Sequence, residues 1–107
     1  MSAARPVAQS VEHLADHAKM TEFELAVASV VLTTQPGDVM SYGEVAGEAG
    51  YPGAARAVGG VLSRIDGLPW WRIVNAAGRL IPHDPERQAG LLRAEGVMIT
   101  DGRVTSG

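Results

Sequence analysis

Residues 41–64 read SYGEVAGEAGYPGAARAVGGVLSR, and this stretch decides the fold. Ser41 is followed three residues later by Glu44, which is the spacing of a capping box at the start of a helix. The residues Gly50-Tyr51-Pro52-Gly53 favour a turn, and a second helix is expected from Ala54 to about Arg64. A helix, a tight turn and a second helix make the outline of a helix-turn-helix.

The segment before this stretch predicts one more helix. Thr21 and Glu24 repeat the capping-box spacing. The helix should end at the turn 35–38, and the apolar residues at helical spacing are expected in the core: Phe23, Ala26, Val27, Val30 and Val31. Residues 1–20 are weakly patterned. We therefore interpret residues 21–107 as one domain preceded by an N-terminal extension.

The segment after the helix-turn-helix predicts a wing. An extended segment is expected to begin at residues 68–71. Residues 72–74 and 79–81 then flank a loop that contains Gly78, which favours a β-hairpin. A hairpin that follows a helix-turn-helix makes a winged version of that fold.

A last helix and a second hairpin are expected near the end. The helix should cover about residues 86–95, bury Leu91 and Leu92 and end at Gly96. The turn Asp101-Gly102 favours a terminal hairpin between 97–100 and 103–105. The predicted fold class is α/β: a small winged helix-turn-helix domain, mostly helical with short β-hairpins.

The composition excludes several classes of function. These 107 residues contain no cysteine, so catalysis through sulfur and thiolate metal sites are excluded for them. The three histidines form no recognisable metal-ligand spacing, and no metal or cofactor is predicted. No apolar run approaches the roughly 20 residues that span a bilayer. We therefore expect a cytoplasmic protein with no membrane partner.

The charge is unevenly distributed along the chain. The formal net charge is −3, with seven acidic and two basic residues in 1–50 and seven arginines against five acidic residues in 51–107. The total disfavours a nucleic-acid partner, because neutralising phosphates dominates such binding. The arginines of the second half favour one, because arginine binds phosphate through a planar fork. A solvated surface with accidental asymmetry is the alternative interpretation.

The second helix of the motif begins with small residues around Arg56, namely Ala54, Ala55, Ala57, Gly59 and Gly60. Two glycines inside a helix cost about 1 kcal/mol each relative to alanine. Close approach of the helix backbone to a nucleic-acid backbone would offset that cost, and free N–H groups at the helix start suit a phosphate. A tightly packed helix crossing is the other explanation for the glycines.

Five ordered segments carry a resemblance to a known family: SYGEVA (41–46), AARAVGG (54–60), PWWRIV (69–74), Asn75 with Gly78, and LLRAEGV (91–97). They closely resemble the DNA-binding domain of O6-alkylguanine-DNA alkyltransferases over residues 22–99. The repair enzymes have Pro-Cys-His-Arg where residues 69–72 stand, and the cysteine accepts the alkyl group. The resemblance places Trp70 at the cysteine and Trp71 at the activating histidine, so the transfer is not expected here. Glu95, which resembles the carboxylate of that activating network, is expected to be structural.

The pattern resembles instead the alkyltransferase-like proteins, which have tryptophan at the cysteine position. The resemblance implies a non-enzymatic sensor that binds double-stranded DNA containing O6-alkylguanine from the minor groove. It also implies that the sensor flips the damaged base and hands the lesion to nucleotide excision repair proteins. Arg56 resembles the arginine that enters the base stack, and Tyr42 resembles the tyrosine that presses on the phosphate beside the flipped nucleotide.

Two groups of site residues are expected. The DNA-binding group is Tyr42, Ala54, Ala55, Arg56, Gly59, Gly60 and Arg64. The lesion pocket is Pro69, Trp70, Trp71, Arg72 and His83. Trp70 is expected to offer its face to the base, whereas Trp71 is expected to pack in the core or at the rim. Arg72 is expected either to contact the base or phosphate or to brace the wing, and His83 is expected near the O6 side or in solvent.

A winged-helix transcriptional regulator is the rival interpretation. Such a protein places its second helix in the major groove and reads base edges with polar side chains. Residues 54–63 offer only Arg56 and Ser63 for that purpose, which disfavours it. An enzyme is disfavoured as well, because the carboxylates are scattered along the chain.

Overall fold

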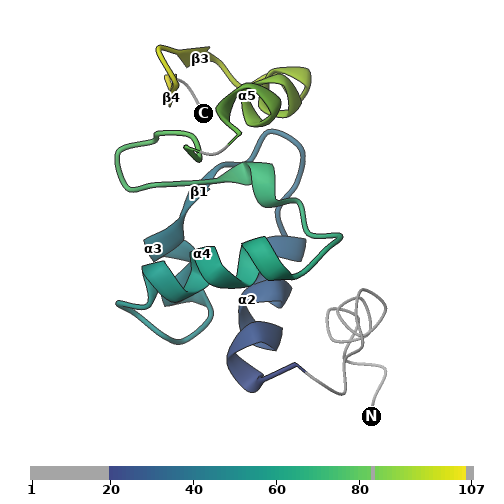
Figure 1. Ribbon diagram of the computed structural model, residues 1–107, viewed down its shortest axis with the longest axis vertical. Helices are drawn as coiled ribbons and strands as arrows, with labels where there is room; N and C mark the ends of the chain where they lie inside the picture. The colour runs from purple at the N-terminus through teal and green to yellow at the C-terminus, as the bar shows by residue number, and fades with distance from the viewer. Residues whose placement is uncertain (1–19, 83, 106–107) are drawn as a thin grey trace.

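The helix-turn-helix is present where the sequence places it. The computed structural model describes residues 20–82 and 84–105 (Figure 1). Helices α3 (Tyr42–Glu48) and α4 (Ala55–Arg64) pack against each other across the turn. The capping box of α3 is complete, since Ser41 Oγ accepts from Glu44 N at 3.0 Å and Glu44 Oε1 accepts from Ser41 N at 2.8 Å.

The turn depends on a left-handed glycine. Gly50 has φ +93°, a conformation that glycine adopts without strain. Its N–H donates to the Gly47 carbonyl at 3.0 Å, and Tyr51 N–H donates to the Ala46 carbonyl at 2.8 Å. This pair of bonds is a Schellman ending for α3. It turns the chain sharply into α4.

Helix α2 (Glu22–Leu32) completes the first core. It begins at the predicted capping box of Thr21 and Glu24 and packs against both α3 and α4. Buried apolar residues from the three helices form the core: Val27, Ala28, Val31, Val45, Ala46, Val58, Val61 and Leu62. Phe23 is half-buried, and its ring meets the edge of Tyr51 at 4.9 Å between centroids.

A second core lies at the other end of the molecule (Figure 1). It is built by α5 (Pro85–Ala94) and the antiparallel hairpin β3 (Ile99–Thr100) and β4 (Arg103–Val104). Leu92 carries the centre of this core, and Gly96 ends α5 with a second Schellman pair. The terminal hairpin is confirmed, with positive φ at both Asp101 and Gly102 as a tight hairpin turn requires.

A short parallel strand pair joins the two cores. β1 (Met40–Ser41) pairs with β2 (Ile73–Val74), and a 3₁₀ turn, η3 (Trp70–Arg72), precedes β2. Adjacent side chains of a strand point to opposite faces. Ile73 accordingly belongs to the first core and Val74 to the second. In η3, Trp70 packs against the first core and Trp71 against the second.

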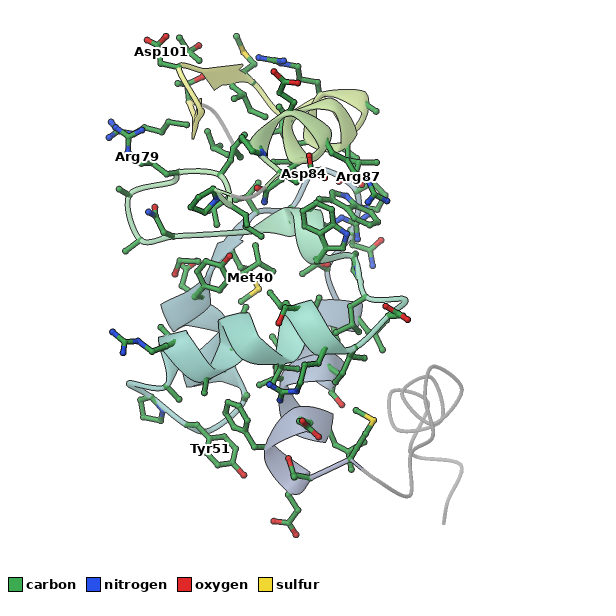
Figure 2. All side chains as sticks on the ribbon, in the orientation of Figure 1. Met40, Tyr51, Arg79, Asp84, Arg87 and Asp101 are labelled. Atoms are coloured by element: carbon green, nitrogen blue, oxygen red, sulfur yellow. The ribbon has the colours of Figure 1, made fainter. Side chains whose placement is uncertain are left out.

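Three sequence predictions in this region are wrong. Residues 72–74 and 79–81 do not pair as a hairpin, because β2 pairs with β1 and Asn75 reverses the chain, its side-chain oxygen accepting from Arg79 N at 2.8 Å. The backbone of Arg79 instead forms an isolated antiparallel β-bridge with Arg103 of the terminal hairpin. The Arg79 side chain points outward from the loop (Figure 2). Residues 70–72 are a 3₁₀ turn rather than extended, and Leu91 is only half-buried.

The fold class is confirmed as a small, mostly helical domain with short strands. Within the described residues, no helix is long and apolar enough to cross a membrane.

Candidate nucleic-acid interface

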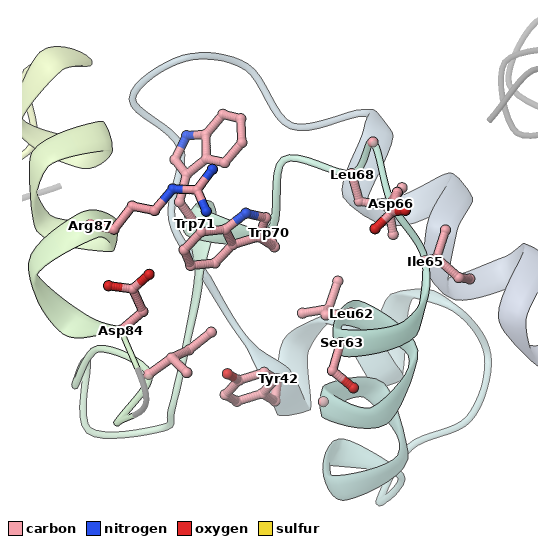
Figure 3. Close-up of a pocket in the computed structure, with 13 residues that line it drawn as sticks. Tyr42, Leu62, Ser63, Ile65, Asp66, Leu68, Trp70, Trp71, Asp84 and Arg87 are labelled. Atoms are coloured by element: carbon pink, nitrogen blue, oxygen red, sulfur yellow. The ribbon is translucent and has the colours of Figure 1, made fainter. Parts of the chain in front are cut away.

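An open cleft of about 940 Å³ lies between the two cores (Figure 3). One side comes from the helix-turn-helix through Tyr42, Gly59 and Leu62, and the other side comes from η3 and α5. The cleft has aromatic, apolar and charged walls, formed by Tyr42, Gly59, Leu62, Ser63, Ile65, Asp66, Gly67, Leu68, Trp70, Trp71, Ile81, Asp84 and Arg87. Its volume lies within the range of clefts that bind small organic molecules.

Both tryptophans of η3 line the cleft. Trp70 and Trp71 are half-buried and meet edge to face, with ring centroids 6.1 Å apart. The guanidinium carbon of Arg87, on α5, lies 5.7 Å from the centroid of the Trp70 ring. Figure 3 shows Trp70 and Tyr42 across the cleft from each other, with Arg87 beside the two tryptophans. The indole ring of Trp70 therefore lines the cleft between Tyr42 of α3 and Arg87 of α5.

Tyr42 begins α3 and is half-buried beside the cleft. Burial raises the pKa of its phenol above the ordinary value of 10.0. The hydroxyl therefore stays protonated at neutral pH and keeps an O–H donor, which suits a phosphate oxygen.

The start of α4 is free of side-chain caps. Ala54 is the N-cap residue and supplies no side-chain hydrogen bond, and Arg56 is exposed in the first turn. A Cβ added at Gly59 would meet only Tyr42 Cε1, at 3.9 Å, and one at Gly60 would meet the flexible end of Arg64 at 3.1 Å. Among residues 20–82 and 84–105, no neighbouring helix comes close enough at these glycines to require them. The packing explanation for their presence is therefore wrong.

Arg64 lies at the opposite end of α4. Its Nη2 pairs with Glu24 Oε2 of α2 at 2.6 Å, and 58% of its side chain is exposed. The backbone N–H of Thr21 and the Arg64 guanidinium hold the pKa of Glu24 below its usual value. An exposed pair of this kind is worth about 0–1 kcal/mol. Arg64 is thus free, at little cost, to exchange its carboxylate for a phosphate.

Arg72 points away from the cleft. Its side chain is 9% exposed and pairs with Glu95 through Nε at 3.0 Å and Nη2 at 2.8 Å, while Nη1 donates to the Thr34 carbonyl at 2.9 Å. Of the two roles expected for Arg72, the structure shows the bracing contact. The placement of Arg72 in the lesion pocket is therefore corrected. Its side chain is buried, and all three guanidinium nitrogens are already hydrogen-bonded to Glu95 or Thr34.

Glu95 collects four hydrogen bonds. Besides Arg72, it accepts from Trp71 Nε1 at 2.8 Å and from Gly37 N at 2.9 Å. The hydrogen bonds from Arg72, then those from Gly37 and Trp71, lower the pKa of Glu95 to about 2. The carboxylate thus ties α5, η3 and the loop after α2 together, which agrees with the structural role expected for it.

This pairing predicts a pH-dependent stability. The pKa of Glu95 falls from 4.5 to about 2 on folding, so its contribution is complete above pH 4.5 and is lost as pH falls toward 2. A shift of that size corresponds to about 3 kcal/mol. Denaturant unfolding followed between pH 7 and pH 2 measures it. Glu95→Gln should be less stable at pH 7 and lack this component, whereas Glu86→Gln, exposed on the same helix, should keep the wild-type profile. Equal profiles for wild type and Glu95→Gln would contradict the assignment.

Sequence reasoning left out part of the cleft. Arg87, Asp84 and Asp66 supply its charged lining, and Figure 2 shows Asp84 and Arg87 on the same side of the molecule. The only sequence signal for Arg87 was its place in the first turn of a predicted helix. Pro69 precedes η3 without lining the cleft, and His83 lies outside the described residues.

The fold and the site define a small helix-turn-helix domain with an aromatic cleft beside its second helix, whose free N–H groups at the helix start suit a phosphate. The family within that class is also clear. The chain belongs to the family described as 6-O-methylguanine DNA methyltransferase, DNA binding domain, which residues 22–97 match.

Individual relatives fit this assignment. The chain is 45% identical over 87 residues to the DNA base-flipping protein of Escherichia coli (strain K12), covering 77% of this chain and 67% of that protein. It is 38% identical over 87 residues to the DNA base-flipping protein of Vibrio parahaemolyticus serotype O3:K6, covering 77% and 87%. Its fold is similar to that of S. pombe Atl1 in complex with damaged DNA containing O6-carboxymethylguanine, with a TM-score of 0.73, 31% identity and coverage of 83% and 92%.

Proposed function

We propose that this protein is a non-enzymatic DNA damage sensor. It binds duplex DNA containing O6-alkylguanine through the minor groove, with α4 against the backbone, and flips the alkylated base into the cleft. The observation that carries the proposal is the cleft of about 940 Å³, walled by Trp70 and Tyr42 and opening beside the uncapped helix α4. A base that leaves the stack beside α4 thus has a pocket within reach.

Helix α4 supplies the grip on the duplex. The uncapped first turn leaves backbone N–H groups for a phosphate. Gly59 and Gly60 carry no side chain, so the helix backbone can approach the DNA closely at these positions. Exposed Arg56 projects from this first turn. It fills the gap that the flipped base leaves, as its counterpart in the resembling family does.

The cleft supplies the selectivity. Extruding a base costs a few kcal/mol, and less where alkylation has already weakened its pairing. Stacking on an aromatic ring returns about 1–3 kcal/mol per base. A damaged guanine is therefore held against Trp70 while an intact guanine stays in the duplex.

The alkyl group stays on the DNA. By the resemblance, Trp70 stands where the repair enzymes have their acceptor cysteine, and these 107 residues contain no cysteine. The protein then marks the lesion for the nucleotide excision repair proteins in the cytoplasm.

The rival function, a sequence-specific regulator, makes a different binding prediction. Fluorescence anisotropy with labelled duplexes at fixed salt distinguishes the two, using one O6-methylguanine or guanine in several flanking sequences. A sensor prefers the lesion by a similar factor in every sequence context. A preference for one sequence that ignores the lesion would support the regulator and overturn the proposed function.

Gly59 tests whether α4 approaches the DNA closely. The structure has room for a methyl group there, so Gly59→Ala should stabilise the free protein by about 1 kcal/mol. The same methyl group would keep the helix away from the DNA backbone and should weaken binding to both duplexes about tenfold, or 1.4 kcal/mol. Thermal unfolding and anisotropy measure the two effects. The matched control is Gly90→Ala in α5, where a Cβ also meets open space, and it should stabilise without affecting binding. Unchanged DNA binding by Gly59→Ala would contradict the close approach.

A further inference from the structure

Gln88 is a buried polar residue that has no part in the proposed binding of the lesion. It lies on α5 with no exposed surface, directly after Arg87. Its amide group makes three hydrogen bonds to backbone. Oε1 accepts from Ile81 N at 2.6 Å, and Nε2 donates to the carbonyls of Trp71 and Ile73, each at 3.0 Å.

The three partners belong to three different segments of the chain, two of which reach the cleft. Trp71 is the second tryptophan of η3, and Ile73 is the first residue of β2, the strand that follows η3. Ile81 lies at the end of the loop that returns toward α5. Trp71 and Ile81 both line the cleft. One side chain thus fixes the tryptophan wall and the loop wall to the same helix.

Only an amide satisfies all three partners. A carboxylate accepts from Ile81 N but has no donor for the carbonyls, and an apolar side chain satisfies none of them. Unpaired backbone groups in a buried place are costly, so the turn and the loop would shift to find water or new partners. Apolar packing alone does not explain a fully buried glutamine at this position.

We infer that Gln88 is a positioning residue that sets the spacing of the cleft walls and thereby the discrimination between O6-alkylguanine and guanine. The inference rests on the proposed function of the cleft. Gln88 touches no DNA itself. It acts by holding Trp71 and Ile81 where the flipped base requires them.

The test compares Gln88→Met with a variant of similar cost to stability that leaves the cleft walls alone. Val27→Ala serves for this purpose, because Val27 is buried in α2 and lines no part of the cleft. For each protein, the affinity ratio for duplexes with O6-methylguanine and with guanine is measured at a temperature where all are folded. Gln88→Met should lower this ratio about tenfold, as expected for the loss of a buried hydrogen-bonded contact, and should shift the tryptophan emission of the free protein. Val27→Ala should lower the melting temperature but change neither the ratio nor the emission maximum.

Gln88→Asn keeps the amide on a side chain one methylene shorter, so it tests the inference even where Gln88→Met does not fold. It should lower the ratio less than Gln88→Met does, because an amide still offers a donor and an acceptor to the backbone groups. A wild-type ratio in both Gln88 variants would overturn the inference while leaving the proposed function intact. Equal affinity of the wild-type protein for both duplexes would overturn the proposed function, and the inference would fall with it.

Discussion

Replacing Arg56 by alanine is expected to abolish the preference for duplexes that contain O6-methylguanine. Arg56 is exposed in the first turn of α4, and its neighbours in that turn are small residues. If it fills the hole in the stack, its loss leaves the extruded state without compensation, and extrusion alone costs a few kcal/mol. The preference for the lesion should fall by about 10- to 100-fold, or 1.4–2.8 kcal/mol.

The control for this variant is another arginine of the same helix. Arg64→Ala removes a residue that pairs with Glu24 and is expected to contact phosphate. It should weaken binding to both duplexes by the same factor and reduce the salt dependence of binding. Anisotropy titrations at two salt concentrations separate the variants. A proportional loss on both duplexes with Arg56→Ala would show that Arg56 is a phosphate contact and not a plug.

Replacing Trp70 by alanine is the second large effect. The indole of Trp70 lines the cleft opposite Tyr42 and is held by Arg87 on α5. Loss of a base–aromatic stack costs about 1–3 kcal/mol, so affinity for the lesion duplex should fall about 5- to 150-fold. Affinity for the unmodified duplex should hardly change, because its bases remain stacked. Trp70→Phe keeps an aromatic face and should retain most of the preference.

The neighbouring tryptophan separates stacking from stability. Trp71→Phe removes the Nε1 donor to the Glu95 carboxylate and should lower the free energy of unfolding by about 1.5–3 kcal/mol, the usual value of a hydrogen bond to a charged group. Its effect on the lesion preference should be smaller than that of Trp70→Ala. A larger effect of Trp71→Phe on the preference would mean that the flipped base stacks on Trp71 and not on Trp70.

The helical part of the fold was predictable because its signals are local. Two capping boxes, at Thr21 and Ser41, mark helix starts by residue types three positions apart, and the glycines at 50 and 96 mark helix ends. The pairing of residues 72–74 was not predictable in this way. Whether residues 72–74 pair with 79–81 or with β1 depends on a partner more than 30 residues away, which no local pattern specifies.

The same distinction between local and distant signals applies to the residues of the cleft. Trp70 and Tyr42 were found by the resemblance of short segments, whereas the α5 side was missed. Gly37 meets Glu95 across 58 positions, and Gln88 reaches Trp71 across 17. Sequence reasoning identifies a glutamine or arginine in an amphipathic helix, but it does not tell which wall that helix will face.

The most direct test of the account is intrinsic tryptophan fluorescence during titration with two matched duplexes, one containing a single O6-methylguanine and one unmodified. Wild-type and Trp70→Phe proteins are compared at fixed salt, and the oligonucleotide is recovered afterwards for mass analysis. For a non-enzymatic lesion sensor we expect tighter binding to the lesion, quenching that depends on Trp70, and a methyl group still on the DNA. Equal affinity and equal quenching with both duplexes, or recovery of demethylated DNA, would contradict it.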